Sequence, residues 1–383
     1  MRILHVTDAS SAGVLTAVTT LARAQSRHPA FAQVVLGYVP RPDSPPPAGI
    51  AELTGDAVEV RRWHRGGRTA MAGLTRRLFS ALGAAEFDVV HLHSSRSGFL
   101  GRGVAALRGQ RERTVYSPHC FAFDRTDFGT APRAVYRVLE RLGAGAANRL
   151  VLVSESEAQV ARAALPGVRT AVLRNSVDVA ALERTAREQA ALQNPGHATG
   201  GPGTGGGPRE LLVVHVGRIQ GQKRPEQFAA VAAAVRAALD VPVRFRWLGD
   251  GDRSRLSSDI EVSGWMPHAA LVGELARADA MLFTSAGEGM PMSVIEAQTL
   301  GVPVIASDVT GLRDIVRDRD TGRLATSEDA LARALTEVLA DPDLRSELGS
   351  SAAAHARRTF DAADLADRSL SAYRSLASGE RKP

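Results

Sequence analysis

The sequence predicts an α/β protein of two Rossmann-like domains, each built on a parallel sheet, which face each other across a cleft. The chain has 383 residues, enough for two full hydrophobic cores. Short apolar segments alternate with longer helix-like segments, a pattern typical of parallel sheets covered by helices on both faces. A glycine-rich stretch separates the pattern into two halves.

The expected strands are short runs of apolar and β-branched residues. In the first half they are Ile3–Val6, Val34–Val39, Val58–Arg61, Val89–Leu92, Thr114–Tyr116, Leu150–Val153 and Ala171–Leu173. In the second half they are Leu211–Val216, Val243–Leu248, Ile260–Val262, Ala280–Phe283 and Val302–Ala306. Helical periodicity appears between them over Val14–Ala24, Arg133–Ala146, Pro225–Ala238 and His268–Ala278.

The domain boundary is expected near residues 196–208, GHATGGPGTGGGP, because such a run cannot pack into a core. We therefore predict an acceptor-binding domain over 1–180, a linker or loop over 181–209, and a nucleotide-sugar-binding domain over 210–358. The remainder, 359–383, is predicted as an amphipathic helix that packs back on the first domain. Its apolar side carries Leu365, Leu370, Tyr373 and Leu376.

The composition excludes several classes of protein. The net charge is +6 and comes almost wholly from arginine, since Lys223 and Lys382 are the lysines of the chain. This charge is either dispersed and solvated or forms a face toward an anionic partner, such as a membrane leaflet, a lipid diphosphate or a nucleotide. No dense basic run is interleaved with aromatic residues, so nucleic-acid binding is not expected. The single cysteine, Cys120, excludes an intramolecular disulfide, and no zinc-site spacing is present.

The location of the protein is expected to be cytoplasmic. The first residues form a strand pattern rather than a signal peptide, and the alanine-rich run Phe228–Leu239 is broken by Arg236 and too short to cross a bilayer. Peripheral contact with the inner face of an anionic cell membrane stays open.

The stretch 285–300, SAGEGMPMSVIEAQTL, is the richest in candidate site residues. It follows a buried strand and passes from a loop into a helix. Pro291 suits the first helical position, and Gly289 and Met290 would then offer backbone N–H groups to a diphosphate or a sugar hydroxyl. Glu288 precedes the helix and Glu296 lies within it.

A second group of candidates follows the strand Leu211–Val216, where the chain reads GRIQGQK over 217–223. Arg218 offers a planar fork to phosphate oxygens and Lys223 a mobile point charge. Two fixed cations would stabilise the negative charge that develops on a departing nucleoside diphosphate.

These motifs resemble the retaining glycosyltransferases of the GT-B fold. Within them the resemblance is to the large family of sucrose synthase and the bacterial mannosyl- and polysaccharide glycosyltransferases (family 4, group 1). Matching features are the Gly-Arg with a lysine five residues on, the two glutamates separated by seven residues, and the segment GVPVIAS. Three further matches are Trp247–Gly251, Gly264–Pro267 and Ala278–Ala280.

The resemblance implies roles in donor binding. Arg218 and Lys223 would hold the diphosphate, and Glu296 would bind the ribose hydroxyls. Glu288, with the amides of Gly289 and Met290 and with Pro291 after them, would position the donor sugar, while Gly264 and Trp265 would lie near the nucleobase. Of these, Glu288, Arg218 and Lys223 are expected to be catalytic. No cofactor or metal is implied beyond the donor, a UDP- or GDP-sugar.

The first half resembles the family more loosely. The loop of Ser11 and Gly13 stands where the family usually has paired glycines, so Gly13 is expected to bind the donor. The segment SPHC over 117–120 resembles bacterial polysaccharide glycosyltransferases, in which the equivalent of His119 contacts the donor sugar, so His119 is expected to be a fourth catalytic residue. Ser11, His93 and Asn175 are acceptor-side candidates.

One argument is independent of the resemblance. The candidates follow the carboxyl ends of predicted strands, where open parallel sheets bind their ligands.

The Asp250–Asp252 pair mimics a metal-binding Asp-x-Asp, but it occupies a loop position in a family that generally works without a bound metal.

The expected activity is retaining sugar transfer to an acceptor hydroxyl in cell-surface polysaccharide or glycoconjugate biosynthesis. The acceptor would be a glycan, a lipid-linked glycan or a small-molecule aglycone. Secondary-metabolite glycosylation is the first alternative. A nucleotide-sugar epimerase of the same fold would release a free epimerised sugar nucleotide, a phosphorylase would be longer, and a non-catalytic partner would only bind the nucleotide sugar.

Overall fold

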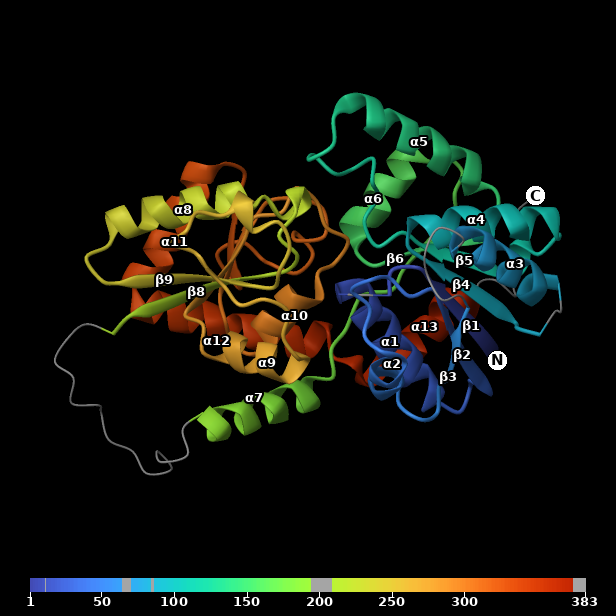
Figure 1. The fold of residues 1–383 in the computed structure, drawn as a ribbon, viewed down its shortest axis with the longest axis horizontal. Helices are drawn as coiled ribbons and strands as arrows, with labels where there is room; N and C mark the ends of the chain where they lie inside the picture. Colours follow the sequence, from blue (N-terminus) through green and yellow to red (C-terminus); the bar gives the residue numbers. More distant parts are fainter. Residues whose placement is uncertain (11, 64–69, 84–85, 194–208, 375–383) are drawn as a thin grey trace. The chain divides into compact units, whose positions relative to one another are not determined.

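The computed structural model describes residues 1–10, 12–63, 70–83, 86–193 and 209–374 (Figure 1). The chain divides into two compact units, one formed by Met1–Ser176 with Ala362–Pro383 and the other by Val177–Asp361. No helix in the described ranges is both long and apolar enough to cross a membrane.

The first unit holds a parallel sheet of seven strands in the order β3-β2-β1-β4-β5-β6-β7. The strands are β1 (Arg2–Thr7), β2 (Gln33–Tyr38), β3 (Glu59–Arg62), β4 (Val89–His93), β5 (Thr114–Ser117), β6 (Arg149–Leu152) and β7 (Thr170–Val172). The helices are α1 (Ala12–Ser26), α2 (Pro47–Thr54), α3 (Ala70–Gly83), α4 (Ser95–Leu107), α5 (Thr130–Ala144), α6 (Glu155–Ala164) and α13 (Leu365–Arg374).

Two hydrophobic layers cover this sheet. On one face, Leu15 and Val18 of α1, Ile50 of α2 and Leu370 of α13 form one cluster with side chains of the strands. The other face packs against α3, α4 and α6 in a separate cluster. The strands are apolar on both faces because both faces are covered.

The second unit holds a parallel sheet of six strands in the order β10-β9-β8-β11-β12-β13. The strands are β8 (Leu211–Val216), β9 (Val243–Leu248), β10 (Glu261–Val262), β11 (Ala280–Phe283), β12 (Val304–Ser307) and β13 (Gly322–Ala325). The helices are α7 (Val179–Gln193), α8 (Pro225–Ala238), α9 (His268–Ala276), α10 (Met292–Thr299), α11 (Glu328–Ala340) and α12 (Pro342–Thr359). Helices α8 and α11 pack together above the sheet in Figure 1, and α9, α10 and α12 lie below it.

The two units correct the predicted boundaries in detail. The segment expected as a linker over 181–209 begins as helix α7, whose Leu182 is buried and which packs against α9 and α10. The run Gly196–Pro208 itself lies outside the described residues. At the other end, α12 stops at Thr359 and a break precedes α13, which packs against α1 of the first unit.

Each sheet has a point where the strand order reverses. It lies between β1 and β4 in the first unit and between β8 and β11 in the second. Loops leave the sheet in opposite directions at such a point, and the space beyond the strand ends is where open α/β sheets bind ligands. Arg218 and Lys223 lie in the loop after β8, and Glu288 lies in the loop after β11.

Candidate functional site

A buried ion pair joins the two loops at the reversal point of the second sheet. The Nζ of Lys223 lies 2.7 Å from the Oε1 of Glu288, and both side chains are largely enclosed. Lys223 ends a short 3₁₀ turn after β8, and Glu288 lies in the loop after β11. Two residues expected to handle the same sugar diphosphate therefore meet directly.

The backbone holds this pair in register. Thr284 donates its hydroxyl proton to the carbonyl of Lys223 at 2.9 Å, and the amide of Ala286 donates to the carbonyl of Gln222 at 2.8 Å. The side-chain amide of Gln222 donates to Gly287 O at 2.9 Å. The β8 loop and the β11 loop thus form one rigid floor.

The aromatic layer under Lys223 is equally fixed. Its ammonium lies 4.5 Å from the ring centroid of Phe283, and Phe283 stacks on His215, which in turn stacks on Trp247. Burial, with the nearby charge of Lys223 as the smaller cause, lowers the pKa of His215 well below its usual value. A neutral ring therefore lies behind the cation and adds no positive charge to repel it.

Glycines let the loops approach one another. Gly311 has φ +81°, and a Cβ built there would lie 2.3 Å from Gly289 O and 2.7 Å from Glu288 O. Gly249 has φ +142°, and its Cβ would lie 2.1 Å from Gly217 O. Both positions need a residue without a side chain, because another residue would push the site loops apart.

The nucleobase candidates also lie near a cation. The guanidinium of Arg218 is 5.8 Å from the ring centroid of Trp265, whose side chain is exposed on the loop after β10. Gly264 precedes it with φ +72°, a left-handed turn that suits glycine. An exposed aromatic face beside an arginine suits a planar, electron-rich base.

Glu296 has a partner that sequence reasoning missed. Its Oε1 lies 2.8 Å from the Nε2 of His268, the first residue of α9. The hydrogen bond with Glu296 raises the pKa of His268 above its usual value. Glu296 is buried in α10 and His268 is exposed, so the carboxylate faces the surface at this point. The only available signal was the position of His268 directly after the Met266–Pro267 turn.

The helix of this region begins one residue later than predicted. Pro291 has φ −68° and ψ 123°, which places it before α10 rather than in its first turn. Its extended ψ carries the chain from the buried loop into the helix. Gly289 and Met290 are buried next to Glu288 in the sequence, three and two residues before the helix start.

In the first unit a small pocket collects three candidates. His93, His119 and Asn175 all line it, together with Ser117 and Arg174. These residues end or follow β4, β5 and β7, so the pocket lies at the carboxyl edge of the sheet. His119 is half-buried, and burial lowers its pKa to about 4. It is therefore neutral at physiological pH.

The turn that carries His119 is unusual in its backbone. His119 has φ +57° and Cys120 φ +110°, conformations that residues with side chains rarely adopt. The buried carboxylate of Glu157 accepts the amide proton of Cys120 at 2.7 Å and that of Val153 at 3.0 Å. Glu157 thereby ties the turn to the end of the neighbouring strand, and such strain is typical of functional positions.

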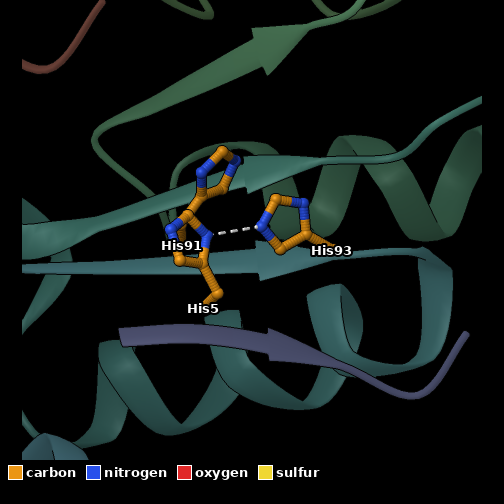
Figure 2. A group of neighbouring side chains, drawn as sticks. All are labelled: His5, His91 and His93. Carbon is orange, nitrogen blue, oxygen red and sulfur yellow. Dashed lines mark hydrogen bonds between the residues drawn. The ribbon is translucent and has the colours of Figure 1, made fainter. Parts of the chain in front are cut away.

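Behind the pocket lies a cluster of buried histidines. His5, His91 and His93 present ring nitrogens close enough together to hold a metal ion (Figure 2). The figure also shows the hydrogen bond between His5 Nδ1 and His93 Nε2, 3.0 Å long. Each nitrogen of the three rings takes part in a hydrogen bond within the unit. Sequence reasoning singled out His93 but missed His5 and His91, which it read as strand residues.

The remaining candidates are less constrained by the structure. Ser11 lies outside the described residues. Gly13 falls in the first turn of α1, exposed, and a Cβ there would meet no described atom within 4 Å. The Asp250–Asp252 pair is engaged in the chain itself, since both oxygens of Asp250 accept from Arg253 at 2.9 and 3.0 Å.

Comparisons with known proteins find matches for both halves of the chain. Residues 12–176 match the family model described as glycosyl transferase 4-like domain, and residues 206–355 match that of glycosyl transferases group 1. A D-inositol 3-phosphate glycosyltransferase of Streptomyces bingchenggensis is 30% identical over 76% of this chain and 69% of its own length. The UDP-Gal:alpha-D-GlcNAc-diphosphoundecaprenol alpha-1,3-galactosyltransferase of Escherichia coli is 27% identical over 69% of both chains.

Solved structures share the fold over nearly the whole chain. Sucrose-phosphate synthase from Thermosynechococcus elongatus superposes with a TM-score of 0.76 at 20% identity, covering 99% of this chain and all of that one. Anabaena HepE in complex with UDP-glucose gives a TM-score of 0.73 at 17% identity, covering 99% of this chain and 100% of its own.

Proposed function

The chain belongs to the group 1 glycosyltransferases of the GT-B fold, and we propose that it transfers a hexose from a UDP- or GDP-sugar to an acceptor hydroxyl with retention of anomeric configuration. That it is a glycosyltransferase using nucleotide sugars follows from its family. The proposal concerns the donor, the stereochemistry, the acceptor and the residues that act.

The observation that carries the proposal is the Lys223–Glu288 pair, whose lysine comes from the same loop after β8 as Arg218. Lys223 and Arg218 stabilise the charge that develops on the leaving diphosphate, because two fixed cations need no reorganisation when the bond breaks. Glu288 holds Lys223 in place and accepts hydrogen bonds from hydroxyl groups of the donor sugar. Glu296, which His268 orients, binds the ribose hydroxyls.

Retention is proposed because the residues suit a reaction at one face of the sugar. The cations draw the leaving group away while the acceptor hydroxyl attacks from the same side, and a phosphate oxygen of the leaving group takes its proton. This route needs no second protein carboxylate to serve as a base. It is supported by the histidines at the pocket, whose lowered pKa values make them weak bases.

UDP is favoured as the nucleotide. The E. coli relative carries UDP-Gal in its name, and HepE was solved with UDP-glucose. The exposed Trp265 beside Arg218 offers a stacking platform rather than a set of base-specific hydrogen bonds. Discrimination between UDP and GDP therefore depends on the space around this ring.

An acceptor that carries phosphate is favoured, within cell-surface polysaccharide or glycoconjugate biosynthesis. The two relatives named above act, by their names, on an inositol phosphate and on a diphospholipid-linked sugar. In this chain Arg174 lines the pocket of His119, and its guanidinium forms no ion pair within the described ranges. A cation at a pocket suits an acidic group on the acceptor.

Peripheral contact with an anionic membrane is proposed through α5. The amphipathicity of this helix is the reverse of the usual one. Arg133, Glu140 and Arg141 bond to the rest of the first unit, whereas the apolar side chains are exposed. The exposed apolar side chains are Val135, Tyr136, Val138, Leu139 and Leu142. An exposed apolar stripe suits the interface of a lipid leaflet, and the net positive charge of the chain favours an anionic one.

The proposal is tested by donor turnover. UDP-glucose, UDP-galactose, UDP-N-acetylglucosamine and GDP-mannose are each incubated with the protein and with phosphorylated acceptors, and nucleoside diphosphate release is followed. One donor is expected to react, and proton NMR of the product is expected to show the anomeric configuration of the donor. An inverted linkage would overturn the retaining mechanism. Binding of a donor without turnover on any acceptor would favour a binding-only protein.

A further inference from the structure

We propose that helix α13 fixes the tautomer of His119 through a chain of hydrogen bonds, so that Nδ1 of His119 is kept as a hydrogen-bond acceptor for a ligand hydroxyl. Gln25, His5 and His93 would then be positioning residues. Which ring nitrogen carries the proton at each step of this hydrogen-bond network does not depend on the activity. The identity of the hydroxyl as one of a carbohydrate rests on the proposed function.

The chain is anchored at a backbone carbonyl of α13. The hydroxyl of Ser369, which is buried, donates its only proton to Ala366 O at 2.7 Å. Ser369 must therefore accept from its other neighbour, the side-chain amide of Gln25, 3.0 Å away. This requirement places the nitrogen of Gln25 toward Ser369 and its oxygen toward His5.

The oxygen of Gln25 sets the first ring. Oε1 of Gln25 lies 2.7 Å from Nε2 of His5, and a carbonyl oxygen can only accept, so Nε2 of His5 carries the proton. In a neutral ring the other nitrogen is then an acceptor. Nδ1 of His5 therefore accepts from Nε2 of His93 at 3.0 Å, the bond drawn in Figure 2.

The same reasoning, that a neutral ring has one donating and one accepting nitrogen, also fixes the proton position on His119 at the pocket. With its proton on Nε2, His93 has an accepting Nδ1, which lies 3.0 Å from Nε2 of His119. His119 then donates through Nε2 and keeps a lone pair on Nδ1. No hydrogen bond to this Nδ1 comes from the residues that the structure describes, and His119 is half-buried at the pocket.

The argument requires neutral rings. Burial lowers the pKa of His5 and of His119 to about 4 and that of His93 well below its usual value. At neutral pH each ring therefore carries one proton, and one proton per ring leaves a single consistent arrangement. Three hydrogen bonds in series also polarise one another in the same sense.

A second branch from the same helix agrees with this order. Gln25 also donates to the hydroxyl of Tyr373 at 3.3 Å, so that hydroxyl gives its proton to Nδ1 of His91 at 2.9 Å. His91 then donates through Nε2 to Ser117 at 2.7 Å, and Ser117 donates to Val151 O. Both branches start from Gln25, and both place the proton on Nε2.

The geometry favours this network over a metal site for the same rings. The rings of His91 and His93 overlap, with centroids 3.9 Å apart and planes inclined by 34°. Lone pairs lie in the plane of each ring, so overlapping rings direct them side by side rather than toward a common centre. The chemistry assigned to the cluster is therefore positioning of His119.

The consequence is selectivity for a ligand hydroxyl that donates a hydrogen bond. A fixed accepting Nδ1 binds a hydroxyl proton and repels a carbonyl or ether oxygen, which brings a second lone pair. A freely exchanging imidazole would accept either. The pocket is thereby matched to sugar hydroxyls, and the selectivity is set in part by Gln25 and His5, which do not line it.

The test is nitrogen-15 NMR of the full chain labelled at histidine, at pH 7.5. The two-bond proton–nitrogen pattern distinguishes the two tautomers, and signals are assigned with single His→Asn variants. We expect the Nε2–H form at His5, His93 and His119, with Nε2 protons that exchange slowly. An Nδ1–H form at His119 would overturn the proposal. So would zinc that remains bound through dialysis and is lost in a His5→Asn variant.

Two variants probe the remote control. Ser369→Ala removes the anchor, so the side-chain amide of Gln25 can flip. The NMR signal of the Nε2 proton of His119 should then broaden or vanish. Ser371→Ala, an exposed serine of the same helix that also bonds to a backbone carbonyl, is the matched control and should leave it unchanged. An unchanged His119 signal in Ser369→Ala would overturn the proposal. These spectra need no substrate, so they decide the proposal even if the proposed activity is not found.

Turnover provides the second readout. Gln25→Glu keeps an acceptor toward His5, and Gln25→Leu removes it. With any donor that the wild type consumes, Gln25→Leu should lower turnover by about three- to tenfold, the effect of one lost hydrogen bond, and Gln25→Glu should restore most of it. Equal loss in both variants, with folded spectra, would contradict the role of the acceptor.

Discussion

Lys223 Nζ and Glu288 Oε1 lie 2.7 Å apart, and the two residues come from loops that follow different strands of one sheet. The pair is largely buried, so each charge depends on the other for its stability. A diphosphate that approaches Lys223 competes with Glu288 for the same ammonium. Donor binding and the integrity of the loops are therefore coupled through this contact.

Removing one partner should affect both stability and turnover. Lys223→Met leaves the buried carboxylate of Glu288 unpaired, which should cost about 3–5 kcal/mol in the free energy of unfolding. Turnover should fall at least a hundredfold, because a cation at the leaving group is lost. Urea unfolding and donor turnover measure the two effects. The Lys223→Met/Glu288→Gln double variant should recover stability but not turnover, and recovery of both would refute the catalytic assignment.

The glycine at 311 should be needed for the donor loop. In Gly311→Ala the new Cβ would meet the carbonyls of Gly289 and Glu288, so nucleotide affinity should fall at least tenfold. Gly55→Ala is the control, since Gly55 has a similar φ of +75° but no described atom within 4 Å of a Cβ. Calorimetry would then show weaker binding in the first variant alone. Equal binding in both would mean that the loop adapts.

His268 should titrate above its usual range. Because Glu296 raises its pKa, the ionised pair is present below about pH 6.5 and is lost as the pH rises through the raised pKa of the folded protein. Proton NMR of the His268 ring should give a midpoint above 6.5, and Glu296→Gln should lower it. A midpoint that is the same in both proteins would show that the two side chains do not interact.

The histidine cluster should make the protein sensitive to acid. The folded-state pKa values of His5 and His119 are lowered to about 4, whereas the unfolded chain takes up protons near 6.5. Stability from these groups is therefore present above 6.5 and lost as the pH falls toward 4, by about 1–3 kcal/mol per pH unit. Urea unfolding between pH 7 and 4.5 measures this slope. It should be shallower in His5→Gln, and an unchanged slope would assign the effect elsewhere.

The outward side of α5 should bind anionic lipid. Cosedimentation with vesicles of phosphatidylglycerol is expected, and vesicles of phosphatidylcholine should retain much less protein. Leu142→Ser should weaken binding several-fold. Leu192→Ser changes a leucine of similar exposure on α7 and serves as the control. Equal loss in both variants, or none in either, would remove α5 from the membrane contact.

Much of the fold could be predicted because its strands are continuous apolar runs. The segments Leu211–Val216, Val243–Leu248 and Ala280–Phe283 match β8, β9 and β11 residue for residue. Strand β13 escaped prediction, because GRLA offers neither an apolar run nor an alternation. It forms through its pairing with β12, which only the assembled sheet provides.

The proximity of candidate residues could be predicted where residue type and loop position agree. Lys223 and Glu288 were both candidates, and the structure brings them together. The hydrogen-bond network of His5, Gln25 and Ser369 was not predictable, because its members lie far apart in the sequence and each reads locally as an ordinary strand or helix residue. Glu157 was missed for the same reason, because it accepts a hydrogen bond from the backbone amide of Cys120, which lies in another loop.

The central claim is that the loops after β8 and β11 form the nucleotide site, and calorimetric titration tests it most directly. The wild type, the Arg218→Ala/Lys223→Ala variant and a control, Arg333→Ala, with an exposed arginine of α11, are titrated with UDP and with GDP. The account predicts micromolar binding of one nucleotide to the wild type and the control, and at least a hundredfold loss in the double variant. Equal affinity in all three proteins would contradict it.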